Sequence, residues 1–84
     1  MRVLLVRHGE AVDGREAPSD HERWLTEAGR RTVTTVGEML GRLDLHYSAI
    51  LTSPLVRAVQ TAEILALTQP GFDGPVAVHR ALST

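Results

Sequence analysis

Near its N-terminus the chain reads Val3-Leu4-Leu5-Val6-Arg7-His8-Gly9, and the expected fold follows from this stretch. Its first four residues form a continuously apolar, partly β-branched run, which at this length predicts a strand buried on both faces. A cation, an imidazole and a glycine follow directly. Open α/β sheets bind ligands at the carboxyl ends of their strands, and glycine lets an anion approach the backbone closely. The stretch therefore predicts a strand that leads into a binding site.

A second stretch has the same organisation. Residues 49–52 read Ala-Ile-Leu-Thr and predict another strand, which is followed by Ser53-Pro54 and, one helical turn later, by Arg57. If the two strands pair in parallel, the residues that follow them meet at one rim of the sheet. Two guanidinium groups and a histidine, from Arg7, Arg57 and His8, would then surround one point. These side chains are suited to binding a phosphate group.

Two helices and a third strand are predicted between and after these stretches. Thr26 is a good N-cap for a helix from about Glu27 to Leu43, whose apolar face should cover the sheet. Ser53 suits the cap and Pro54 the first turn of a second helix. The apolar stripe predicted for this second helix leaves Arg57 off it and free; the stripe consists of Leu55, Ala58, Val59, Ala62, Leu65 and Ala66. Residues 76–78 predict the third strand.

The elements together predict an α/β fold with three layers, α/β/α, and a mainly parallel sheet, formed by residues 1–84 as one incomplete domain. Strands from residues 3, 49 and 76 leave open sheet edges, which invite pairing with another chain. We therefore expect a homodimer, a strand swap or dependence on a further segment.

Composition excludes several functional classes. The net charge is −1, with 9 basic and 10 acidic side chains, so no overall field favours nucleic acid or an anionic membrane. The chain has no cysteine, which excludes disulfides, thiolate catalysis and cysteine zinc sites. No apolar run is long enough for a signal-peptide core or a transmembrane helix, so a cytoplasmic protein is the expectation.

Three motifs give the sequence a family resemblance. In order, they are Leu4-Leu5-Val6-Arg7-His8-Gly9-Glu10, Leu25-Thr26-Glu27-Ala28-Gly29 and Leu51-Thr52-Ser53-Pro54-Leu55-Val56-Arg57-Ala58-Val59-Gln60-Thr61-Ala62. The sequence resembles the histidine phosphatase superfamily, also called the phosphoglycerate mutase-like proteins, and within it the SixA-type phosphohistidine phosphatases. Members carry a second catalytic histidine on a later strand. The chain resembles the N-terminal half of such a phosphatase.

The resemblance implies roles for individual residues. His8 would be the nucleophile that forms a covalent phosphohistidine, and Arg7 and Arg57 would neutralise the phosphoryl oxygens without a metal or other cofactor. The same arginines would bind substrate together with Gly9, Glu10 and Ser53. For Glu10 two readings stay open: it orients an arginine or the substrate, or it is a solvated loop carboxylate.

The implied substrate is a phosphohistidine on a phosphotransfer protein. Two alternatives remain: a small-metabolite phosphomonoesterase, and a truncated module that binds phosphate or a partner without turnover. Hydrolysis is the expectation for a complete phosphatase, and weak or absent turnover is the expectation for residues 1–84 alone. A further histidine, His79, follows the third strand. We expect it not to be catalytic, because it comes one strand-and-helix unit earlier than the second histidine of the family.

Overall fold

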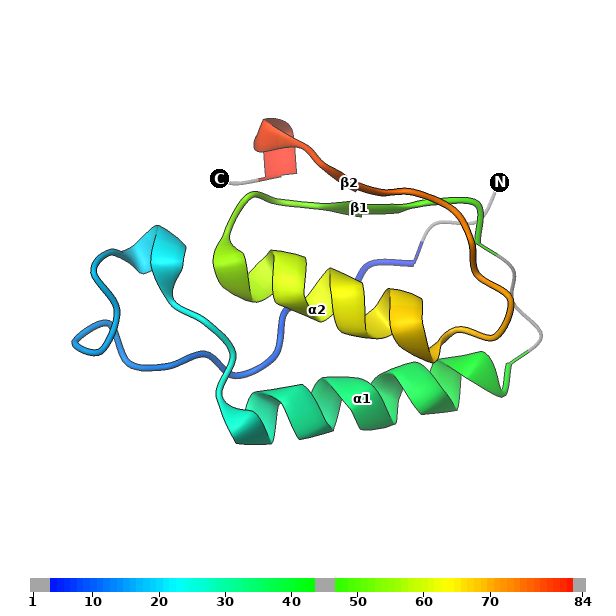
Figure 1. Cartoon of the computed structure of the whole chain (residues 1–84), viewed down its shortest axis with the longest axis horizontal. Helices are drawn as coiled ribbons and strands as arrows, with labels where there is room; N and C mark the ends of the chain where they lie inside the picture. Colours follow the sequence, from blue (N-terminus) through cyan, green and yellow to red (C-terminus); the bar gives the residue numbers. More distant parts are fainter. Residues whose placement is uncertain (1–3, 44–46, 83–84) are drawn as a thin grey trace.

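A computed structural model of the chain describes residues 4–43 and 47–82. Figure 1 shows two helices and a two-stranded sheet, joined by loops that carry two short 3₁₀ helices. In chain order the elements are η1 (Asp20–Glu22), α1 (Glu27–Gly41), β1 (Ile50–Thr52), α2 (Val56–Thr68), β2 (Val76–Val78) and η2 (Arg80–Leu82).

The sheet is built by one β-α-β unit. β1 and β2 pair in parallel, with Ile50 opposite Val76 and Thr52 opposite Val78, and α2 connects them. The sheet, α2 and α1 are stacked in that order (Figure 1), so both helices lie on one side of the sheet in the described part of the chain. The predicted parallel sheet and incomplete α/β fold are thus confirmed, with helices described for one of the two outer layers.

The segment before the site does not form the predicted strand. Residues 4–6 lie outside any strand, and Val3 lies outside the described residues. Leu5 is 90% exposed, and Leu4 and Val6 are also exposed. A continuous apolar run becomes a buried strand only where other elements cover both of its faces. Because the described helices cover one side of the sheet, the prediction is wrong for residues 4–6.

Helix α1 begins where the sequence predicts and packs differently. The hydroxyl of Thr26 accepts a hydrogen bond from the Gly29 amide at 2.9 Å, which confirms Thr26 as the N-cap. The helix ends at Gly41, two residues before the predicted end, and its main packing partner is α2, which lies between it and the sheet (Figure 1). A Cβ atom on Gly37 would collide with the side chain of Thr68 on α2. The missing side chain thus permits the close approach of the two helices.

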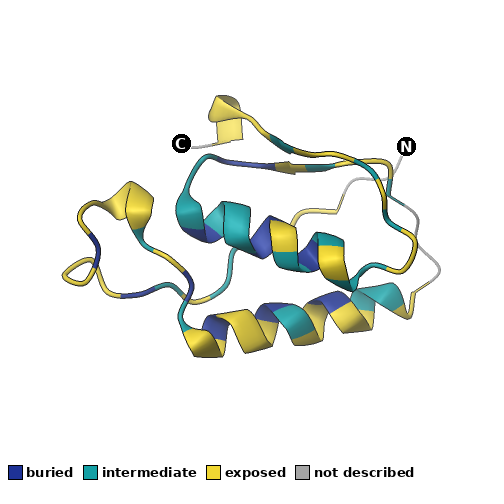
Figure 2. Cartoon of the chain, viewed as in Figure 1, coloured by how far each residue is buried: buried dark blue, intermediate teal, exposed yellow. Residues whose placement is uncertain are grey.

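Helix α2 buries a different stripe from the predicted one. It begins at Val56 with Leu55 as its N-cap, so the prediction that Ser53 caps it is wrong. Its buried residues are Arg57, Thr61, Ala62 and Leu65 (Figure 2). Arg57 is therefore neither off the buried stripe nor free, because polar contacts with distant segments draw this side of the helix inward.

The apolar core is small. Leu25, Val33 and Leu65 form its buried centre, with Leu40, Ile50 and Ile64 packed around them. These residues come from the loop before α1, from both helices and from β1, so the core joins the helix pair to the sheet. Neither described helix combines the length and the hydropathy needed to cross a bilayer.

Gly29→Ala should destabilise the fold. A Cβ atom at this buried position would collide with the backbone carbonyl of Glu10, which cannot rotate away as a flexible side chain would. We expect a loss of about 1–3 kcal/mol in the free energy of unfolding, measured by urea denaturation. Gly14→Ala is the matched control, because no atom lies within 4 Å of a Cβ there. Equal stability of the two variants would contradict this packing.

The unpaired sides of β1 and β2 generate a second prediction. Within residues 4–43 and 47–82 each of these strands pairs only with the other, which leaves one open edge on each, and such edges pair with other chains. We propose that the protein self-associates or exchanges strands through these edges. Light scattering after size-exclusion chromatography should give a mass that rises with concentration, whereas a monomer at all concentrations would refute the proposal.

Candidate active site

The ring of His8 is held between two hydrogen bonds. Its Nδ1 atom donates to the carbonyl oxygen of Gly9 at 2.7 Å, and its Nε2 atom accepts from Nε of Arg57 at 3.2 Å. A carbonyl oxygen can only accept and a guanidinium can only donate, so the contacts assign the proton to Nδ1. The contacts therefore fit the tautomer with the proton on Nδ1 and the lone pair on Nε2, the atom through which a histidine nucleophile attacks.

Arg57 lies at the centre of the site. Its side chain is 10% exposed and all three of its nitrogens are engaged. Besides the contact with His8, Nη1 donates to the backbone carbonyl of Asp20 at 2.7 Å, and Nη2 donates to the Asp20 carboxylate at 3.3 Å. The guanidinium thus joins α2, the segment around His8 and η1.

A hydroxyl one helical turn along α2 anchors the backbone of the site. Thr61 donates from Oγ1 to the carbonyl oxygen of Arg57 at 2.7 Å and accepts from the Gly9 amide at 3.2 Å. The side chain is buried, so water does not readily replace these bonds. Thr61 therefore fixes Gly9, and through Gly9 the carbonyl group that holds the ring of His8.

The three sequence motifs are hydrogen-bonded to one another. The Gln60 side chain accepts from the amide of Leu25 at 2.8 Å. The amide of Thr26 donates to the carbonyl oxygen of Glu10 at 2.9 Å, and the Thr26 hydroxyl donates to the Glu10 carboxylate at 3.1 Å. Segments far apart in the chain thereby form one frame around His8.

Asp20 is a site residue that the sequence did not predict. Hydrogen bonds from the Arg23 and then the Arg57 side chain lower the pKa of its carboxyl group below the ordinary value of 3.8. Because the pKa is lower in the folded state than in the unfolded one, these contacts stabilise the fold at pH values above the ordinary pKa. This stabilisation is lost as the pH falls through the lowered pKa. Asp20 is therefore an anion at neutral pH. Its one sequence signal is its place in the polar loop after the His8 segment.

The remaining predicted residues lie in different environments. Arg7 is exposed, and no hydrogen bond or ion pair engages its guanidinium within the described residues. The carboxylate of Glu10 contacts Thr26, so it supports the start of α1 and is not directed at an arginine. Ser53 is buried directly after β1.

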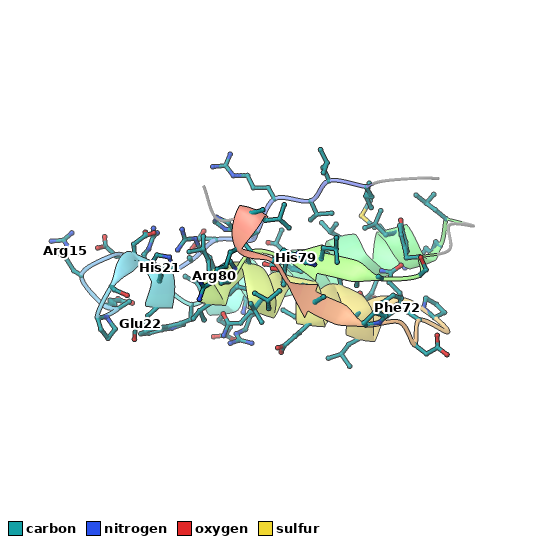
Figure 3. The ribbon with its side chains drawn as sticks, turned by 90° about the horizontal axis from the view of Figure 1, so that it is seen from above. Arg15, His21, Glu22, Phe72, His79 and Arg80 are labelled. Carbon is teal, nitrogen blue, oxygen red and sulfur yellow. The ribbon has the colours of Figure 1, made fainter. Side chains whose placement is uncertain are left out.

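His79 directly follows β2, at the carboxyl end of the parallel sheet, where Ser53 follows β1. Its amide donates to the carbonyl oxygen of Thr52 at 2.8 Å, and the residue is exposed. Figure 3 shows His79 and Arg80 at this end of β2 and His21 in η1. Among the residues that the structure describes, no three His, Asp or Glu side chains are grouped as a metal site requires.

Comparisons of this chain with known proteins point to one protein family. The model of the histidine phosphatase superfamily (branch 1) matches residues 3–83. An uncharacterized protein of Picosynechococcus sp. is 45% identical over 71 residues, which are 84% of this chain and 43% of that protein. The mitochondrial serine/threonine-protein phosphatase Pgam5 of Drosophila ananassae is 38% identical over 63 residues, which are 75% of this chain and 21% of that protein.

A solved structure is also similar. The protein histidine phosphatase SixA complexed with tungstate superposes with a TM-score of 0.71 at 28% identity. The match covers 83% of this chain and 44% of that one. The chain thus spans less than half the length of the relatives that it matches.

Thr61→Val tests the anchor of the site. Valine has the shape of threonine without the hydroxyl, so the Gly9 amide loses its acceptor while packing is kept. We expect a loss of about 1–3 kcal/mol in unfolding free energy, the usual cost of an unsatisfied buried donor. Thr61→Ser keeps the hydroxyl and should retain the Gly9 amide shift in NMR spectra, which Thr61→Val should change. If both variants keep the wild-type shift, the bridge does not form.

Proposed function

The chain belongs to the histidine phosphatase superfamily, and on that premise we propose that it hydrolyses a phosphoryl group through a covalent phosphohistidine on His8. One observation carries the proposal: both ring nitrogens of His8 have partners that leave the proton on Nδ1 and the lone pair on Nε2. A neutral imidazole attacks phosphorus through such a lone pair.

The charges at the site support this chemistry. A phosphoryl group carries two or more negative charges, which repel a nucleophile unless cations neutralise them. Arg57 presents its guanidinium beside Nε2 of His8, and Arg7 is the neighbouring residue in the chain. Guanidinium groups bind phosphoryl oxygens by paired, charge-assisted hydrogen bonds. The two arginines would supply the positive charge that a metal supplies in other phosphatases.

The reaction has two steps. The lone pair on Nε2 of His8 forms a bond to phosphorus while the bond to the leaving group breaks, and the leaving group departs with that electron pair. Water then attacks phosphorus, the phosphorus–nitrogen bond breaks, and its electron pair returns to Nε2. During both steps the Gly9 carbonyl keeps the proton on Nδ1 and fixes the direction of the ring.

The favoured substrate is a phosphohistidine on a phosphotransfer protein in the cytoplasm. An imidazole whose other ring nitrogen is protonated leaves as a neutral group and needs little help from an acid, and the one carboxylate bonded to Arg57, that of Asp20, is ion-paired. The similar solved structure is that of a protein histidine phosphatase. A small phosphorylated metabolite is the other substrate class. Neither nucleic acid nor a membrane enters the proposal.

A non-catalytic module is the second candidate. All three nitrogens of Arg57 already have protein partners, and Arg7 is exposed. Such a site could bind phosphate or a partner without turning it over. The experiment below separates the two candidates.

His8→Ala should abolish hydrolysis of a phosphohistidine peptide, and Arg57→Ala should reduce kcat/KM about 10²–10³-fold by removing transition-state charge stabilisation. His21→Ala is the control, since His21 is exposed in η1, and should leave activity unchanged. Rates are compared with a phosphoserine peptide and a sugar phosphate. Unchanged activity in His8→Ala refutes the mechanism, and phosphate binding without turnover in the wild type favours the binding module.

A further inference from the structure

The protein contacts of Arg57 involve a nitrogen of each edge that could bind an oxyanion. A guanidinium binds an oxyanion with two N–H groups from one edge, either Nε with Nη2 or Nη1 with Nη2. On Arg57 the first edge contacts Nε2 of His8 and the Asp20 carboxylate, and the second contacts the Asp20 carbonyl and carboxylate. Because Nε has a single N–H group, which is directed at His8, a phosphoryl group can bind the Nε–Nη2 edge as a fork only if His8 releases it, and on Nη2 it then meets the Asp20 carboxylate.

The two contacts of Asp20 differ in strength and environment. The backbone carbonyl lies 2.7 Å from Nη1, whereas the carboxylate lies 3.3 Å from Nη2 and its side chain is 66% exposed. An exposed, longer ion pair is weak and is screened by salt. The carboxylate is thus the partner that an incoming dianion displaces most readily.

A second arginine, Arg23, keeps the Asp20 carboxylate near the site after the carboxylate has left Arg57. Arg23 donates from Nη1 to the other carboxylate oxygen of Asp20 at 3.2 Å, and its Nε donates to the carbonyl oxygen of Val12 at 2.7 Å. Asp20 therefore stays paired with Arg23 after it leaves Nη2 of Arg57, and its carboxylate can return when the phosphoryl group leaves.

We propose that the Asp20 carboxylate, on Nη2 of Arg57, takes part of the position that a substrate oxyanion has on the Nε–Nη2 edge and competes with the phosphoryl group for it. The inference rests on the proposed function. The phosphoryl oxygens take both N–H groups of that edge, which also frees the lone pair on Nε2 of His8 for attack. The bond from Nη1 to the Asp20 carbonyl remains as the fixed point about which the guanidinium is held.

This exchange also explains how the guanidinium of Arg57 can stay buried when no substrate is bound. A largely buried charge with no partner is strongly destabilising. The exposed carboxylate compensates part of the Arg57 charge in the resting site, beside the acceptors on His8 and the Asp20 backbone, and the phosphoryl group takes its place in the occupied one. Asp20 is accordingly a residue that sets the affinity for substrate and product.

Asp20→Asn is the direct test, because it removes the charge and keeps the backbone carbonyl. Dissociation constants for orthophosphate and for tungstate are measured by calorimetry at pH 7. We expect binding to tighten about two- to fivefold, the range of a weak exposed ion pair, and more so at low ionic strength. Asp13→Asn makes the same change of net charge in the same loop, where the Asp13 carboxylate pairs with Arg15 (labelled in Figure 3) and not with Arg57, and should bind as the wild type does.

Unchanged or weaker binding in Asp20→Asn overturns the inference, because Asp20 would then have no effect on phosphate binding or would help Arg57 to bind phosphate. Asp20→Ser is a second variant that removes the charge without an amide group and should also bind more tightly. In the wild type, phosphate should shift the ¹³Cγ resonance of Asp20, and no shift at saturation also counts against the exchange. Arg57→Ala separates this inference from the proposed function. If that variant binds phosphate with wild-type affinity, Arg57 does not form the phosphate site and the proposed function itself fails.

Discussion

The pairing of one buried guanidinium organises the structure. Burying the guanidinium of Arg57 requires partners for its donors. They come from His8 and Asp20, which lie 49 and 37 residues away in the chain. Because one planar group must satisfy both, the approach of η1 and of the His8 segment to α2 is fixed by a polar interaction. The small apolar core could not specify these directions by itself.

The local elements were predictable from the sequence, because their signals are local. β1 and β2 are short apolar runs between turns, and Thr26 with the periodic residues after it specifies the start of α1. The pairing of these strands in parallel follows from a helix of sufficient length between them. The motifs around His8 and Arg57 also identify the family correctly, since they combine residue types whose joint occurrence is specific.

The orientation of α2 and the role of Asp20 could not be predicted in this way. An apolar stripe places Arg57 and Thr61 toward solvent, but long-range hydrogen bonds to His8 and Gly9 bury both residues. Nothing in the loop sequence indicates which of its acids lies near an arginine 37 residues later. The prediction of a strand at residues 4–6 was wrong for a similar reason, because the burial of a strand depends on which elements cover each of its two faces.

The long separation between Gly9 and Thr61 has a consequence for the order of folding. β1, α2 and β2 are consecutive, so this unit closes with short loops, whereas the Gly9–Thr61 bond joins residues 52 positions apart. Long loops close more slowly and at a larger entropic cost. The segment of His8 and Gly9 is therefore expected to dock last, onto a preformed β-α-β unit. Pulse-labelling hydrogen exchange would contradict this order if the Gly9 amide were protected before the amides of α2.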